Sequence, residues 1–304
     1  MPSSPSLAEE ARAGRVVSGH GRRLLVEGED GQRVLCHTRG KKSEAVVGDR
    51  VRWRASGDEG VIESVEPRVN LLYRQDEWKT KAFAANIDQL LVVVAAEPVF
   101  SESQLARALI AAAEAAIPAR IALNKRDLPS FVAARARLQP YAAMGVAVIE
   151  LALKADGGNA RELLAPLLAG RATLVLGPSG AGKSTLVNLM VVDAKAQIGE
   201  ISQALNTGRH TTTTTQWYWI DAGHTSALID SPGFQEFGLR QVGADRLATL
   251  MPDIALHASS CRFYNCTHRQ EPGCGVLAAL ARGEIAESRY RIYREIYEEL
   301  SASR

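Results

Sequence analysis

The sequence has few cysteines, no long apolar run and no apolar segment near its start. Only 4 of the 304 residues are Cys, and the longest apolar run, LLVVVAA beginning at Leu90, is far too short to span a bilayer. The opening residues, MPSSPSLAEEARAG, lack the apolar core of a signal peptide. We therefore expect a cytoplasmic protein with no membrane partner, in which the cysteines do not form disulfides.

The chain also lacks a large excess of charge of one sign. Its net charge is +2, and its 46% hydrophobic and 23% charged residues are typical of a folded soluble protein. Local charge is more informative, because eleven basic side chains oppose five acidic ones between Arg12 and Arg54, a net +6. Two interpretations of this segment stay open: a solvated strand surface, or a surface that faces nucleic acid.

No internal repeat is visible, but the pattern of the chain changes along its length. After a flexible tail over residues 1–10, residues 11–70 contain five or six short strands, such as QRVLCHT and DRVRWRA, which favour a small barrel of the OB type. Over residues 71–245, after a connector, buried strands alternate with helices, including one helical stretch at 129–145. This alternation indicates an α/β fold with a parallel sheet covered on both faces. Residues 246–304 hold a cysteine-containing loop and a helical segment.

The stretch LVLGPSGAGKSTLVN matches the pattern of a phosphate-binding loop, G-x-x-x-x-G-K-[ST]. It follows an apolar strand and opens a helix, so backbone N–H groups and the helix N-terminus can surround phosphates. Lys183 is expected to reach the β- and γ-phosphates, and Ser184 to bind Mg²⁺. The residues expected to contact the nucleotide here are Gly177, Pro178, Ser179, Gly180, Ala181, Gly182, Lys183, Ser184 and Thr185.

Two motifs downstream are typical of GTPase switches. ALIDSPGF is an apolar strand ending in D-x-x-G, which places Asp230 to hold Mg²⁺ and the N–H of Gly233 to sense the γ-phosphate. Between it and the phosphate loop lies TGRHTTTTT, where a threonine is needed to close over Mg²⁺. We favour Thr213 among Thr211 to Thr215.

The position that often carries a water-orienting glutamine, directly after D-x-x-G, holds Phe234. His210, beside the threonine run, is a candidate replacement. A surface histidine without a catalytic role is an equally open interpretation.

A guanine-reading motif, Asn-Lys-x-Asp, lies upstream of the phosphate loop in IALNKRDL. Asp127 can accept hydrogen bonds from guanine N1–H and the exocyclic amine, Asn124 can brace the loops, and Lys125 can lie along the ring. Ligands of α/β sheets bind at the carboxyl ends of the strands, whatever the order of the chain. The order base reader, phosphate loop, switches therefore predicts a circularly permuted GTPase domain.

Three cysteines and one histidine lie close together in CRFYNCTHRQEPGC: Cys261, Cys266, His268 and Cys274. Such a Cys₃His set suits one structural Zn²⁺. His257, four residues before Cys261, is a competing ligand. The segment AESRYRIYREIYEEL carries an apolar stripe at helical spacing, which either packs on its own domain or faces an RNA-containing partner.

This order of motifs closely resembles the RsgA family of bacterial small-ribosomal-subunit biogenesis GTPases, from the basic barrel through NKRD, GPSGAGKST, GRHTTTT and DSPGF to the Cys/His cluster. The resemblance implies a permuted GTPase with an OB domain before it and a zinc domain after it. It implies late action on the small (30S) subunit, with contacts to 16S rRNA and GTPase activity stimulated by the subunit; we expect a monomer. A hydrophobic residue at Phe234 is similar to the family. A Ser-Ala pair is expected after VAVIEL to contact guanine, but Ala152 and Leu153 stand there, which puts the bracing of this loop in question.

Two other functions remain open. One is a zinc-containing RNA-binding protein with a vestigial nucleotide site, and the intact Lys183, Ser184 and Asp230 argue against it. The other is an ATP-using enzyme in which NKRD is accidental. A change of base preference in Asp127→Asn discriminates against this last alternative.

Overall fold

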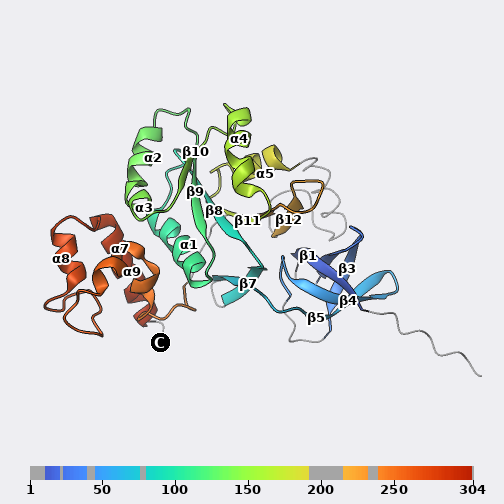
Figure 1. The fold of residues 1–304 in the computed structure, drawn as a ribbon, viewed down its shortest axis with the longest axis horizontal. Coiled ribbons are helices and arrows are strands. Elements are labelled where there is room, and N and C mark those ends of the chain that lie inside the picture. The colour runs from blue at the N-terminus through green and yellow to red at the C-terminus, as the bar shows by residue number, and fades with distance from the viewer. Residues whose placement is uncertain are drawn as a thin grey trace, which may run out of the picture.

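The computed structural model describes residues 11–20, 23–39, 45–75, 80–191, 215–231 and 239–302. Figure 1 shows a small barrel, a central sheet flanked by helices, and a helical region at the far side of that sheet. None of the helices in these ranges has the length and apolar character that a membrane span requires.

The first five strands form a closed barrel of the expected OB type. β1 pairs with both β2 and β4, and β3 pairs with β5 in parallel, so the order around the barrel is β1-β2-β3-β5-β4. The strand alternation places Val51 and Trp53 inside, while Arg50 and Arg52 lie outside. The strands are β1 (Arg12–His20), β2 (Arg23–Gly28), β3 (Arg33–Thr38), β4 (Arg50–Ser56) and β5 (Glu59–Val65).

A hairpin, β6 (Leu71–Gln75) and β7 (Thr80–Ala85), connects the barrel to the central sheet. That sheet has the order β10-β9-β8-β11-β13-β12, and all neighbours are parallel except β12 and β13. Its strands are β8 (Gln89–Ala95), β9 (Ala119–Asn124), β10 (Val148–Glu150), β11 (Ala172–Leu176), β12 (Gln216–Trp219) and β13 (Ala227–Asp230). Every residue of β8 and β11 is buried, as their continuous apolar runs predict.

Helices cover both faces of the sheet. Figure 1 shows α1 (Glu102–Glu114), α2 (Phe131–Arg137) and α3 (Gln139–Ala143) on one side, and α4 (Gly157–Leu168) and α5 (Lys183–Met190) on the other. The single helical stretch predicted over 129–145 is thus two short helices. Pro140 lies in the first turn of α3 and has no N–H to continue the earlier helix, so the chain breaks at Leu138.

The helical region after the sheet consists of η1 (Leu247–Leu250), α7 (Pro252–Ala258), α8 (Gly275–Ala281) and α9 (Glu287–Ala302). α9 buries Tyr290, Tyr293, Ile296 and Leu300, so its apolar stripe packs within the protein, as the first of the two interpretations predicted. Arg289 of the same helix is buried as well. Its guanidinium pairs with Asp253 of α7 at 2.8 Å and covers the ring of Tyr141 in α3, which joins this region to the central sheet's helices.

The barrel and the central sheet share one strand contact. β1 pairs with β12 in antiparallel fashion through Ser18 and Gln216, which makes a continuous eleven-stranded sheet. Glu27 of β2 strengthens the contact, because its buried carboxylate accepts a hydrogen bond of 2.5 Å from the indole of Trp219. The barrel is therefore attached to β12, the strand that follows the predicted first switch.

Candidate nucleotide site and metal centre

The base-reading motif, the phosphate loop and the Asp of the second switch, which the structure describes, meet at one edge of the sheet. Asn124 is the last residue of β9, Leu151 follows β10, Gly177 follows β11, and Asp230 ends β13. Because these four strands are parallel, their carboxyl ends lie side by side although the base reader precedes the phosphate loop in the chain. The permuted order of the motifs is therefore compatible with a single nucleotide site.

The phosphate loop has the backbone that its glycines predict. A Cβ on Gly177 would overlap the carbonyl oxygen of Val93, and Gly182 has φ +113°, in the left-handed region that favours glycine. Lys183 folds back over the loop, where its ammonium donates to the carbonyls of Gly177 at 2.7 Å and Pro178 at 2.9 Å. The amine thus lies over the space that the loop encloses. Burial lowers its pKa, and nearby Asp230 acts in the opposite direction.

Asn124 links the phosphate loop to the loop after β10. Its side chain is buried, its amide donates to Ala181 O at 2.9 Å, and its oxygen accepts from Leu153 N at 3.1 Å. The bond from Leu153 N shows how the loop after β10 is held although the expected Ser-Ala pair is absent. Leu153 engages Asn124 through its backbone, so the loop is braced without a hydroxyl side chain. Both Ala152 and Leu153 are buried.

The rest of the base-reading loop faces outward. Asp127 is exposed, and Lys125 has a left-handed backbone with φ +65° while its ammonium donates to the carbonyl of Glu97. Glu97 also accepts a hydrogen bond of 2.6 Å from Ser130, and the neighbouring Pro98 approaches Gly180 of the phosphate loop. The sequence did not predict that the loop after β8, EPVF at Glu97–Phe100, contacts both the base-reading loop and the phosphate loop, because nothing in it resembles a nucleotide motif.

Asp230 and Ser184 are the described residues predicted to bind Mg²⁺. One carboxylate oxygen of Asp230 is buried without a hydrogen-bond partner among the described residues. Burial raises the pKa of this carboxyl to about 6, and Lys183 partly opposes that rise. Ser184 is exposed in the first turn of α5. A buried carboxylate oxygen without a partner among the described residues fits a hard divalent cation, which prefers oxygen ligands.

Several predicted residues lie outside the described residues. These are His210, Thr213 and the other threonines up to Thr214, together with Gly233 and Phe234. Thr215, which follows them, is described and buried directly before β12. The assignments of His210, Thr213 and Gly233 therefore stay predictions.

The predicted zinc ligands come together in the helical region. The ligand atoms of Cys261, Cys266, His268 and Cys274 all lie within 4.8 Å of one another, so the cluster could hold a zinc ion. Cys261 Sγ lies 3.3 Å from His268 Nδ1. The competing candidate, His257, instead lies 3.8 Å from the carboxylate of Glu284.

Neighbouring side chains hold the loop that carries these ligands. Glu271 accepts from the backbone N–H of Thr267 at 2.7 Å and of Arg269 at 3.0 Å. The hydroxyls of Tyr290 and Tyr293 donate to the carbonyls of His268 and Thr267, respectively. These contacts fix His268 in a left-handed conformation with φ +58°. The tyrosines of α9 thus support the metal loop as well as the core.

Comparison with known proteins agrees with this architecture. A family model described as RsgA GTPase matches residues 65–240. The small ribosomal subunit biogenesis GTPase RsgA of Variovorax paradoxus is 60% identical over 296 residues, which cover 96% of this chain and 93% of that protein. The protein of the same name from Burkholderia pseudomallei strain K96243 is 52% identical over 305 residues, or 99% of this chain and 96% of that one.

Two solved structures share the fold over nearly their whole length. YjeQ from Thermotoga maritima has a TM-score of 0.72 at 31% identity and covers 96% of this chain and 99% of its own. YloQ, described as a circularly permuted GTPase, has a TM-score of 0.70 at 25% identity and covers 99% of both chains. The permuted order of motifs, the single sheet edge at which they meet and these relatives lead to one conclusion: the chain belongs to the RsgA GTPase family.

Proposed function

We propose that this protein hydrolyses GTP to GDP and phosphate during maturation of the small (30S) ribosomal subunit, to which it binds in a nucleotide-dependent way. The observation that carries the proposal is the convergence of Asn124, Gly177 and Asp230 at one sheet edge. The names of the relatives from Variovorax and Burkholderia supply the ribosomal context. The basic barrel is consistent with contacts to 16S rRNA.

Recognition of guanine rests on the loop after β9. Asp127 is exposed at the sheet edge and free to accept from the two donors of guanine that adenine lacks. Asn124 holds this loop against the phosphate loop through its two hydrogen bonds. Lys125 lies along the base, and the backbone at Ala152 and Leu153 forms the remaining wall. The backbone bond from Leu153 to Asn124 supports this arrangement.

Hydrolysis rests on charge stabilisation at the transferring phosphate. Lys183 leaves the carbonyls of Gly177 and Pro178 and donates to the phosphates, while the backbone N–H groups of the loop surround them. Ser184, Thr213 and Asp230 would hold Mg²⁺, which would supply positive charge to stabilise the transferring phosphate. Gly233 senses the γ-phosphate, and His210 orients the attacking water in place of the glutamine that Phe234 replaces.

The remaining features complete the proposal. The domains are a barrel at residues 11–70, a permuted GTPase domain at 71–245 and a zinc-binding domain with its C-terminal helix at 246–304, after a short tail. Zn²⁺ in the Cys₃His cluster plays a structural role, because all four ligands come from the chain. We further propose that the protein acts as a monomer in the cytoplasm.

GTP turnover with and without purified small ribosomal subunits tests the proposal. We expect slow turnover alone and strong stimulation by small subunits, with no comparable stimulation by large subunits. Lys183→Ala serves as a control that removes the phosphate contact and abolishes turnover under both conditions. If small subunits bind but turnover stays at zero, the protein is an RNA-binding zinc protein with a vestigial nucleotide site.

A further inference from the structure

A cavity of about 330 Å³ lies between the barrel and the central sheet, away from the nucleotide site. Its floor includes Asp88, Ala172 and Ala227, which lie at the starts of β8, β11 and β13. It therefore opens at the amino ends of the parallel strands, whereas the nucleotide motifs lie at the carboxyl ends. A volume of this size is at the lower end of the range for small-ligand sites and suits one nucleotide.

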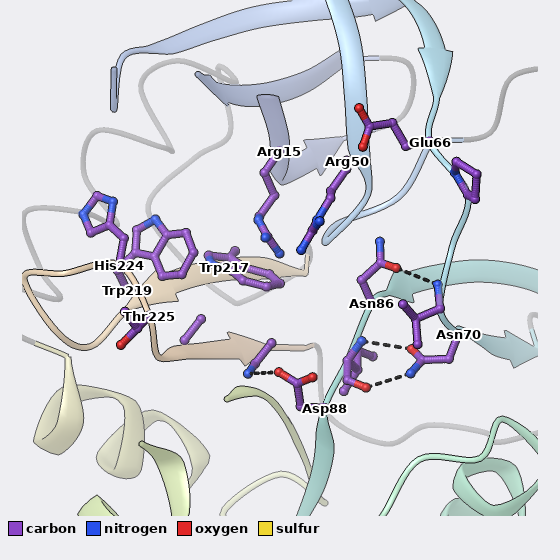
Figure 2. Close-up of a pocket in the computed structure, with 15 residues that line it drawn as sticks. Arg15, Arg50, Glu66, Asn70, Asn86, Asp88, Trp217, Trp219, His224 and Thr225 are labelled. Atoms are coloured by element: carbon purple, nitrogen blue, oxygen red, sulfur yellow. Dashed lines mark hydrogen bonds between the residues drawn. The ribbon is translucent and has the colours of Figure 1, made fainter. Parts of the chain in front are cut away.

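Two arginines from the barrel enter this cavity. Figure 2 shows Arg15 of β1 and Arg50 of β4 side by side, both directed towards Trp217. Within the described part of the chain, neither guanidinium forms an ion pair, whereas Arg52 and Arg54 of the same β4 strand pair with Glu66 and Glu63. Burial lowers the pKa of Arg15 and the neighbouring charge of Arg50 lowers it further, while the carboxylates of Glu27 and Asp88 act in the opposite direction. Two adjacent guanidinium groups with no carboxylate of the described residues within ion-pair distance are suited to an anion, above all a phosphate.

The described acidic groups of the cavity form no ion pair with these arginines, although the charge of Asp88 acts on Arg15 from a longer distance. Glu66 lies 3.2 Å from Arg52, and Asp88 accepts a hydrogen bond of 2.7 Å from the backbone of Ala172. Both carboxylates are thus engaged by other partners.

Aromatic rings form the wall beside the arginines. The guanidinium carbon of Arg15 lies 4.4 Å from the centroid of the Trp217 ring. The rings of Trp219 and His224 stack, with 4.9 Å between their centroids and 3° between their planes. His224 lies in the turn between β12 and β13, and its side chain is 50% exposed, so its outer face is open. Its backbone has φ +51°, a conformation that costs a residue with a side chain some free energy. Glu27 holds the stack in place through its 2.5 Å bond to Trp219.

We propose that this cavity binds one nucleotide of a single-stranded RNA segment, with its phosphate between Arg15 and Arg50 and its base stacked on His224. Paired arginines beside an open aromatic stack supply the two interactions that such segments use, phosphate contact and base stacking. That the RNA belongs to the small ribosomal subunit rests on the proposed function. A free nucleotide offers the same chemistry, so the test separates the two sources.

The position of the site connects it to the switches. The hairpin of β12 and β13 carries Trp219 and His224 at its cavity end, and pairs Gln216 with Asp230 at its nucleotide end. The same four-residue strands thus border both sites. RNA bound in the cavity can therefore bias the position of Asp230, which provides a route by which the subunit stimulates hydrolysis.

The test measures binding of a fluorescein-labelled single-stranded RNA dodecamer by anisotropy, with the nucleotide site saturated by GDP and Mg²⁺. Arg50→Glu should weaken binding at least about tenfold, and His224→Ala about fivefold or more, the loss expected for one stacked base. Arg54→Glu is the matched control, because it makes the same charge change on the same face of β4. We expect it to weaken binding less than about threefold. Urea unfolding midpoints verify that each variant folds.

Equal losses in Arg50→Glu and Arg54→Glu, or unchanged binding in both Arg50→Glu and His224→Ala, would overturn the proposal. Competition by adenosine or guanosine monophosphate as effective as competition by the dodecamer would assign the site to free nucleotides instead. GTP turnover of the wild-type protein with small subunits is measured in parallel. If small subunits stimulate GTP turnover but the cavity variants bind RNA like the wild type, only the cavity proposal is refuted. If the cavity variants lose RNA binding as expected but small subunits do not stimulate turnover, only the proposed ribosomal function is refuted.

Discussion

Asn124→Ala is expected to separate the two halves of the nucleotide site. Asn124 is 4% exposed and bridges Ala181 O and Leu153 N, whose residues are 0% and 4% exposed. Truncation to Ala removes both hydrogen bonds and leaves two buried backbone groups without partners. Each such group costs about 1–3 kcal/mol, so the free energy of unfolding should fall by about 2–6 kcal/mol.

The same change should weaken GDP binding by about tenfold or more, because the base-reading loop loses its attachment to the phosphate loop. Urea unfolding gives the stability change, and titration calorimetry gives the affinity for GDP. Asn159→Ala is a suitable control, since Asn159 is exposed in the first turn of α4 and should change stability by less than about 0.5 kcal/mol. An Asn124→Ala protein with the stability and GDP affinity of the wild type would refute the assigned bracing role.

Four further predictions concern the base, the metals and the water. Asp127→Asn should move nucleotide preference from GTP towards xanthosine triphosphate in competition assays; an unchanged preference would show that NKRD does not read the base. Asp230 has its pKa raised by burial to about 6, so the folded protein holds this proton more tightly than the unfolded chain and loses stability as the pH rises from about 4 to 6. Asp230→Asn should therefore stabilise the nucleotide-free protein by on the order of 2–3 kcal/mol at pH 8 and much less at pH 4, as urea unfolding at both values can check. His268→Ala should lose zinc in elemental analysis while His257→Ala keeps it, and full retention in the former would contradict the ligand assignment. His210→Ala should slow GTP hydrolysis while GTP affinity holds, and equal turnover would remove His210 from the mechanism.

Features encoded in short stretches could be predicted from the sequence. The phosphate loop, the end of β13 and the Cys₃His cluster each depend on a few neighbouring residues whose chemistry limits what they can do. The permuted order was predictable too, because parallel strands bring their carboxyl ends to one edge regardless of connectivity. The strand pattern of the barrel likewise follows from the alternation of residues such as Val51 and Trp53.

Features that depend on distant contacts could not be predicted in this way. QWYW, which forms β12, is too short and too aromatic to show a period, and its role emerges only from pairing with both β13 and β1. The cavity draws on Arg15 of β1, Arg50 of β4 and the hairpin that carries Trp219 and His224, three segments with no common spacing. The bracing of Leu153 by Asn124 uses a backbone N–H, so the side-chain pattern at that position carries no signal of it.

The place of β11 in the sheet also sets the time at which the protein becomes able to bind nucleotide during its synthesis. β8 pairs with β9 on one side and β11 on the other, so its fully buried residues lack one neighbour until Ala172–Leu176 has been made. At roughly 5–20 residues per second, that interval lasts on the order of 4–15 s, in which an apolar strand edge is open to wrong partners. The base-reading loop is complete well before the phosphate loop, so nucleotide cannot assist the early stages of folding. The last strand of the central sheet to be made, β13, also brings Asp230, so the proposed Mg²⁺ ligands are complete only as the sheet is finished.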